Sequence, residues 1–281
     1  MAPLTRFRAN KDHVHGDLAR TYYTQRASVP GTLLVTEATF IDSRAGGYAN
    51  APGIWSDAQI AGWKAVRASS RLGFFFSIVD QLTFPKKKKQ VTDAVHAKGS
   101  FIFLQLWALG RVASPGVLSE EGGFDVVGAS PIRYNGVTAA GDESVVPREL
   151  TAAELKEYVE LYTKAAKNAI EAGFDGVEVH AANGYLLDQF LQSVSNDRTD
   201  EYGGSIQNRL RFPLEVVDAV VKAVGAERTG VRVSPWNDFQ GEKGIPLVHP
   251  RFPQLKPFFF PIRHGHEGST SDIHCIRGAH S

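Results

Sequence analysis

Residues Gly173–Arg209 read GFDGVEVHAANGYLLDQFLQSVSNDRTDEYGGSIQNR, and they carry more information on the fold than any other segment. Phe174–Val179 is an apolar, β-branched run after a helix-ending glycine, which predicts a buried strand. His180, Asn183 and Tyr185 follow where this strand stops. In a repeating βα protein the carboxyl ends of the strands form the active-site face, so these side chains indicate chemistry. The alternative is a core histidine with satisfied hydrogen bonds, followed by an Asn-Gly turn.

Strand-like runs recur on both sides of this segment, with helices between them. The predicted strands are Ala2–Phe7, Thr32–Thr36, Phe101–Leu106, Val177–Val179 and Val231–Val233. The helix before the fourth strand is specified by a T-x-x-E capping box at Thr151 and Glu154, and Gly173 ends it. Such alternation implies parallel βαβ units with right-handed crossovers. The predicted fold class is therefore α/β, a (β/α)8 TIM barrel that is incomplete here, with strands 1 to about 5 present.

A further helix is predicted to begin after Ser205, because apolar residues recur there at helical spacing. Pro213 lies within this helix and should kink or break it. Four polar residues around the start of this helix are interpreted as a structural network rather than a catalytic set: Asn196, Arg198, Asp200 and Arg209.

The composition excludes several classes of protein. Basic and acidic residues nearly balance, 31 against 30, so there is no electrostatic footprint for nucleic acid or an anionic membrane. The single cysteine, Cys275, excludes an intrachain disulfide framework and fits a reducing compartment. No apolar run approaches the ~20 residues that cross a bilayer, and the N-terminus has no signal-peptide core. We therefore expect a cytoplasmic protein with neither a nucleic-acid nor a membrane partner.

The longer pattern resembles the signature of a known family. H-x-A-N-G-Y-L, then Q-F-L and S-N-x-R-x-D-x-Y-G-G-S-x-x-N-R, is similar to the old yellow enzymes, the FMN-dependent ene-reductases. The segments YYTQRASVPGTLLVTEAT and GYANAPGIWS resemble its fungal branch, which indicates secondary-metabolite chemistry. The resemblance covers about residues 1–65 and 91–241. It implies a TIM barrel that binds FMN, takes electrons from NADPH or NADH, and reduces the C=C bond of a small α,β-unsaturated aldehyde or ketone.

The resemblance implies catalytic roles for the three polar residues after the fourth strand. His180 and Asn183 match the pair that binds the carbonyl oxygen of the acceptor. Two donors on this oxygen polarise an enone and stabilise the enolate charge, each by roughly a few kcal/mol. Tyr185 matches the general acid that protonates the α-carbon while flavin N5 delivers hydride to the β-carbon.

The resemblance also implies a set of flavin-binding residues: Pro3, Leu4, Thr5, Ala38, Gln105, His180 and Arg232. Thr5 matches a threonine near flavin O4 and N5, while Pro3 and Leu4 match positions whose backbone lies against the flavin. Ala38 matches a small residue beneath the isoalloxazine ring.

Two of these flavin-binding roles have structural alternatives. Gln105 matches an amide on the flavin pyrimidine edge, but a buried glutamine can instead make a structural hydrogen bond. Arg232 matches an arginine near flavin N1 and O2, but it can instead pair with a structural carboxylate. Trp107 is expected to shape the pocket wall. No metal site is predicted.

Parts of the chain depart from the family pattern. The chain begins inside the first predicted strand, and strands that would close the ring are missing. Residues 66–90 are interpreted as an aberrant insert such as a retained intron, because their removal places Ile60, Trp63, Val91 and Val95 on one helical face. A lineage-specific loop is the other possibility. Residues 242–281 form a divergent tail, which leaves residues 1–241 as a partial FMN-binding domain.

These departures leave a second function open. The polypeptide as written could be a catalytically inactive truncated product of such a gene, with a retained intron and a frameshifted tail. The missing strands favour this alternative, because an unclosed sheet exposes its edges. A full-length form could be a homodimer.

Overall fold

Four parallel strands form the main sheet in a computed structural model that describes residues 1–64, 91–235 and 239–241. The strands are β1 (Leu33–Phe40), β2 (Phe101–Trp107), β5 (Gly176–Ala181) and β6 (Thr229–Val233), and this is also their order across the sheet. Each neighbouring pair is parallel. Helical segments connect them, as the predicted βαβ units require.

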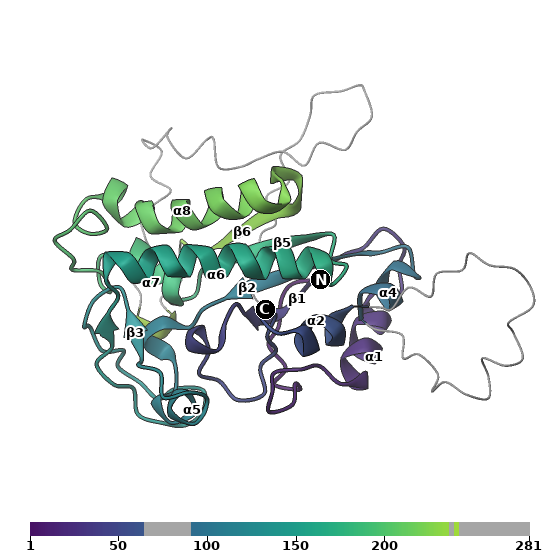
Figure 1. Ribbon diagram of the computed structural model, residues 1–281, viewed down its shortest axis with the longest axis horizontal. Coiled ribbons are helices and arrows are strands. Elements are labelled where there is room, and N and C mark those ends of the chain that lie inside the picture. Colours follow the sequence, from purple (N-terminus) through teal and green to yellow (C-terminus); the bar gives the residue numbers. More distant parts are fainter. Residues whose placement is uncertain (65–90, 236–238, 242–281) are drawn as a thin grey trace, which may run out of the picture.

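Two helices are long, α6 (Ala152–Glu171) and α8 (Ile206–Val224), whereas α1 (Asp17–Arg26), α2 (Asp57–Trp63) and α4 (Val91–His96) are shorter. Helices α6 and α8 lie side by side, and α1, α2 and α4 gather near the start of the sheet (Figure 1). The connection from β2 to α6 holds a short helix, α5 (Pro115–Glu120), and two short paired strands, β3 (Val127–Gly128) and β4 (Arg148–Glu149). Helix α7 (Leu186–Leu191) follows β5.

The first predicted strand, Ala2–Phe7, is wrong, because the structure has no strand there. Backbone–backbone bonds to β1 are made at Met1: its amino group donates to Leu33 O at 2.7 Å, and Val35 N donates to its carbonyl oxygen at 2.9 Å. Two bonds at one residue do not make a ladder, so this segment lies against β1 without extending the sheet.

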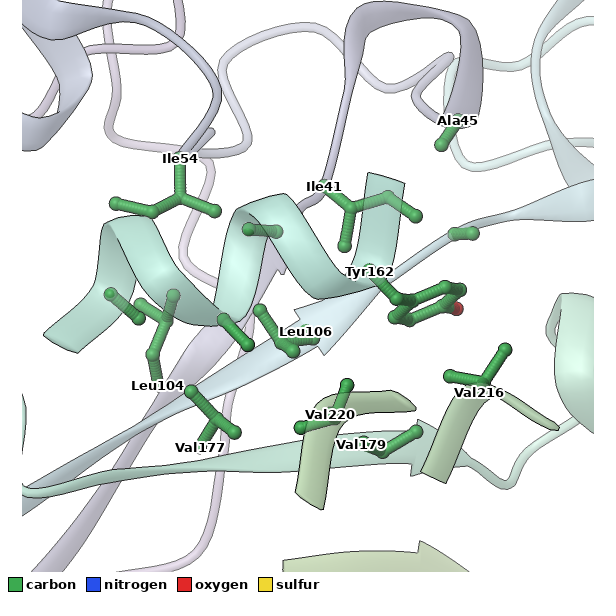
Figure 2. Packing of buried hydrophobic residues seen from close by; sticks show 14 of the residues in the cluster. Ile41, Ala45, Ile54, Leu104, Leu106, Tyr162, Val177, Val179, Val216 and Val220 are labelled. Atoms are coloured by element: carbon green, nitrogen blue, oxygen red, sulfur yellow. The ribbon is translucent and has the colours of Figure 1, made fainter. Parts of the chain in front are cut away.

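The main core lies between the sheet and the helices. Because side chains alternate along a strand, Leu104 and Leu106 of β2 share one face of the sheet with Val177 and Val179 of β5. All four are fully buried. They pack with Tyr162 of α6 and with Val216 and Val220 of α8 (Figure 2).

Helix ends follow the capping signals in the sequence. Thr151 and Glu154 form the predicted capping box of α6, and the Ser205 hydroxyl accepts from Asn208 N at the start of α8. Of the two expected outcomes at Pro213, the break is wrong, since α8 continues through it, and the kink stays a prediction. Pro213 is buried with its neighbour Phe212, so packing of the apolar face offsets the one backbone hydrogen bond that proline cannot make.

Helices α2 and α4 meet although 26 residues of sequence, 65–90, separate the described segments. The Thr92 hydroxyl donates to Trp63 O at 3.2 Å. Ile60, Trp63, Val91 and Val95 all belong to the main core, as their common helical face predicted. The origin of residues 66–90 stays a prediction.

Two segments singled out in the sequence lie outside the described residues: the insert 66–90 and the tail 242–281, which contains Cys275. Within the described part of the chain, no helix combines the length and apolarity that a membrane crossing needs.

The polar residues before and at the start of α8 form the predicted structural network. The Asn196 amide donates to Phe190 O and Tyr202 O, and its oxygen accepts from Arg198 N. Arg198 also pairs with Asp200 and donates to two backbone carbonyls of the β2–α6 connection. Arg209 donates to Leu191 O at 2.9 Å. These bonds fix the loop between α7 and α8.

Candidate active site

A cavity of about 320 Å³ lies at the carboxyl ends of the sheet strands, within the range of small-molecule sites. Every residue named in advance for catalysis or flavin binding lines it. The lining consists of Ala2, Pro3, Leu4, Thr5, Ala38, Gln105, Trp107, His180, Asn183, Tyr185 and Arg232. These residues come from segments far apart in the sequence, so the fold gathers them at one place.

Strand register brings the central members of this set together. Ala38 of β1 pairs with Gln105 of β2, which pairs with Glu178 of β5. His180 of β5 pairs with Arg232 of β6. Paired residues in neighbouring strands point to the same face, so this row of side chains faces away from the helices and toward the cavity.

A register shift in β1 decides which of its side chains faces the cavity. Val35 pairs with Phe103, whereas Ala38 rather than Glu37 pairs with Gln105, so β1 contains one extra residue there. The hydroxyl of Thr36, inside the shift, accepts from Gln105 N at 3.1 Å. The small Ala38 therefore lies at the cavity, and a buried carboxylate does not.

Glu37 instead holds the N-terminal segment from outside the cavity. Its Oε2 accepts from Arg6 N at 3.0 Å, and its Oε1 accepts from the Tyr23 hydroxyl at 3.3 Å. Burial raises the pKa of Glu37 to about 7. Arg6 comes directly after Leu4 and Thr5 in the sequence. Its bond to Glu37 therefore fixes the position of the cavity wall that these two residues form.

Glu178 joins Gln105 and Arg232 behind the cavity. Gln105 Nε2 donates to Glu178 Oε1 at 2.7 Å. Arg232 donates to the same carboxylate from Nε at 2.7 Å and from Nη2 at 2.9 Å. The structural alternatives for Gln105 and Arg232 are thus present, although both residues also line the cavity. Glu178 was not predicted as part of the site. The signal that could have indicated it is its single charge inside the otherwise apolar strand segment GVEVH.

His180 is a buried and neutral imidazole. Burial lowers its pKa to about 3, and the charge of Arg232 acts in the same direction. Its Nδ1 has no hydrogen-bond partner among the described residues. The described residues therefore do not supply the satisfied hydrogen bonds of a core histidine, and the ring keeps unused hydrogen-bonding capacity beside the cavity.

The loop after β5 is held in a left-handed conformation. Asn183 and Gly184 have φ of 60° and 75°, a conformation that asparagine and glycine tolerate best, so the Asn-Gly turn is present. Asn183 N donates to the Ser234 hydroxyl at 2.7 Å, and Gly184 N donates to Asp188 Oδ2 at 2.9 Å. Burial raises the pKa of Asp188 to about 6. Asp188 and Ser234 were not predicted as part of the site, because no sequence motif indicates them.

Tyr185 follows this loop and presents a protonated phenol. Burial raises its pKa to about 12, partly offset by a hydrogen bond with the Gln240 side chain. Its ring packs edge-on against Trp107 at 4.9 Å and His180 at 5.1 Å between ring centroids. The phenol can therefore donate a proton throughout the neutral pH range, beside the one imidazole of the cavity.

The side chains present fit an isoalloxazine ring. Its pyrimidine edge alternates carbonyl oxygens with an N–H, and the cavity offers a carboxamide, a guanidinium and a hydroxyl from Gln105, Arg232 and Thr5. The indole N–H of Trp107 and His180 Nδ1 are buried and find no partner in the described part of the chain, so a polar ligand could satisfy them. Among residues 1–64, 91–235 and 239–241, no three His, Cys, Asp or Glu side chains cluster as metal ligands.

Comparison with known proteins finds the same architecture. The sequence model of the NADH:flavin oxidoreductase / NADH oxidase family matches residues 1–69 and 84–248. Chanoclavine-I aldehyde reductase of Penicillium roqueforti is 54% identical over 241 residues, which cover 86% of this chain and 57% of that protein. A protein of Epichloe festucae var. lolii named "probable inactive reductase" is 46% identical over 264 residues, covering 94% and 60%.

The structure of an old yellow enzyme homologue from Zymomonas mobilis superposes with a TM-score of 0.73 at 39% identity. The match covers 86% of this chain and 61% of that one. The chain therefore spans less than two thirds of the length of each of these three proteins.

Proposed function

Because the chain belongs to the NADH:flavin oxidoreductase / NADH oxidase family, as a relative of the old yellow enzymes, we propose that its cavity binds FMN and reduces an activated C=C bond there. The predicted family, the predicted class of incomplete (β/α)8 barrel and the family's FMN cofactor are confirmed. The proposed substrate is a small α,β-unsaturated aldehyde or ketone, with NADPH or NADH as reductant.

The observation that carries this proposal is the convergence of distant segments on one cavity. Thr5, Gln105 and Arg232 reach it from the N-terminal segment, β2 and β6, and they would hold the FMN ring. His180 and Tyr185 reach it from β5 and the loop that follows. Chance would not place all the expected groups around a single cavity.

Each polar group of the cavity has a defined task in the proposed reaction. The neutral His180 and the Asn183 amide would bind the carbonyl oxygen of the acceptor and stabilise negative charge that develops on it. Bound FMN, once reduced by NADPH or NADH, would supply the hydride for the β-carbon of that acceptor. The Tyr185 phenol would hold a proton near the α-carbon and transfer it there, which its high pKa permits at neutral pH.

The alternative of an inactive protein also has an observation in its favour. One similar protein is named "probable inactive reductase", so relatives of this sequence need not all be active. Our proposal and this alternative differ in a measurable property, because only an active protein both binds FMN and turns over an enone. The cytoplasmic location and the homodimer stay predictions.

The test is an FMN titration of the purified full chain, followed by turnover with NADPH and with NADH on a simple cyclic enone. We expect saturable FMN binding with a shifted flavin spectrum, and enone-dependent consumption of the nicotinamide cofactor. Binding without turnover would favour the inactive alternative. An unchanged flavin spectrum at saturating FMN would overturn the proposal altogether.

A further inference from the structure

Glu178 lies at the centre of the sheet between two residues that line the cavity. It is in β5, with β2 on one side and β6 on the other. Its carboxylate accepts one hydrogen bond from Gln105 and two from Arg232, at 2.7 to 2.9 Å. The Glu178 side chain is 13% exposed and that of Arg232 is 30% exposed. Glu178 itself is not part of the cavity lining, so it acts on a ligand through its neighbours.

The carboxylate determines the orientation of the Gln105 amide. An ionised carboxylate only accepts hydrogen bonds, so the amide nitrogen of Gln105 has to face Glu178. The amide oxygen is then turned away from Glu178. Gln105 consequently offers an acceptor to a ligand in the cavity, as the N–H between the two carbonyls of a flavin pyrimidine edge requires.

The carboxylate also balances the charge of Arg232. A guanidinium and a carboxylate joined by two parallel hydrogen bonds form a strong, oriented pair. Without Glu178 the cavity edge would carry one uncompensated positive charge. That charge would favour the reduced form of FMN, which is an anion at neutral pH, over the neutral oxidised form. A cofactor that is too easily reduced is a poor donor to an enone.

We propose that Glu178 is a positioning residue that orients the Gln105 amide toward the cofactor and offsets the charge of Arg232, so that bound FMN stays a strong reductant. This inference rests on the proposed function, because it concerns FMN in the same cavity. It assigns two effects to one carboxylate: its reach and its acceptor oxygens orient Gln105, and its charge sets the preference between the two forms of FMN.

Two substitutions separate these effects in the purified full chain. Glu178→Gln keeps the size and removes the charge, so reduced FMN should bind about tenfold more tightly relative to oxidised FMN. This ratio raises the midpoint potential by ~30 mV for a two-electron couple. Glu178→Asp keeps the charge and shortens the reach, so oxidised FMN should bind several-fold more weakly while the potential stays near that of the unsubstituted protein.

The matched control is Glu157→Gln, which removes the carboxylate of an exposed Glu–Arg pair with Arg44. It should change neither the FMN dissociation constant nor the potential. Circular dichroism and thermal unfolding check that each variant folds.

The outcomes distinguish this inference from the proposed function. If the unsubstituted chain fails to bind FMN, both are overturned. If it binds FMN but Glu178→Gln leaves the potential unchanged, only the role of Glu178 is overturned. Should Glu178→Gln not fold, Glu178→Asp decides alone, because an unchanged dissociation constant for oxidised FMN contradicts the positioning role and a weakened one supports it.

Discussion

The two faces of strands β2 and β5 differ sharply, although their residues alternate along the same two strands. On the helix-facing side, Leu104, Leu106 and Val177 are fully buried in a continuous apolar core (Figure 2). On the cavity side, Gln105 and His180 are equally buried but polar. The helix face gains stability from each side chain that it buries, whereas the cavity face has to compensate polar groups one by one.

The compensation on the cavity face is incomplete. Glu178 satisfies Gln105 and Arg232, but His180 Nδ1 and the indole N–H of Trp107 have no partners among the described residues. Buried polar groups without partners cost free energy of folding. Such groups, together with strongly shifted pKa values, are typical of sites that bind a ligand. One face of these strands thus stabilises the fold, whereas the other has the features of a ligand site.

The largest expected effect is on the cavity face. Tyr185→Phe removes the proposed proton donor, so turnover of an enone should fall roughly 10²- to 10⁴-fold, the usual contribution of a general acid. FMN affinity and thermal stability should hardly change. The matched control is Tyr134→Phe, because Tyr134 and Tyr185 are both partly buried against the same hydrophobic cluster, which contains Trp107. Equal losses in the two variants would mean that the phenol of Tyr185 has no special role.

On the helix face, Leu106→Ala should lower the free energy of unfolding by about 2–5 kcal/mol, because it leaves a hole in the core. FMN affinity of the folded protein should stay within about threefold. Chemical denaturation and an FMN titration measure the two quantities. Leu18→Ala, at a 73% exposed position of α1, is the control and should stay within about 0.5 kcal/mol. A large loss of FMN affinity in Leu106→Ala would show that the two faces are not independent.

The pH dependence of the unfolding free energy also distinguishes the cavity face from the helix face. The pKa of His180 is about 3 when folded, against about 6.5 in an unfolded chain. Below pH 6.5 the unfolded chain binds a proton that the folded state refuses, so His180 destabilises the fold as the pH falls. From pH 7.5 to 5 this amounts to about 2 kcal/mol, which His180→Gln should abolish.

Denaturant melts at the two pH values test this expectation. His96→Gln supplies a control of opposite sign, because the hydrogen bond to Asp175 raises the pKa of His96. Its contribution to stability is present at low pH and is lost as the pH rises. If the His180 variant keeps the full acid sensitivity of the unsubstituted protein, the imidazole is not buried as the structure has it.

The smallest expected effect lies at the start of α6, whose capping residues do not line the cavity. Thr151→Ala removes the capping box of α6 and should cost about 1 kcal/mol of unfolding free energy, with no change in FMN affinity. Thr163→Ala, in the middle of α6, should cost less, because alanine suits a helix interior. A larger loss for Thr163 would mean that capping does not limit the stability of α6.

Much of the site could be predicted from the sequence, because strand ends are local features. His180, Asn183 and Tyr185 were placed at the end of a strand that the structure confirms as β5. Glu178 was not singled out, since nothing local says that its neighbours in space carry an amide and a guanidinium. The first predicted strand failed for a related reason: a strand exists only where a partner pairs along it.

The sequence by itself determined the alternation of strands and helices, the capping of α6 and the residue types at the strand ends, because all these depend on neighbours along the chain. Only the tertiary structure decided the register. One extra residue in β1 brings Ala38 to the cavity and takes Glu37 away from it. That choice depends on pairing with β2 and on the partners that Tyr23 and Arg6 give to Glu37, which no local signal encodes.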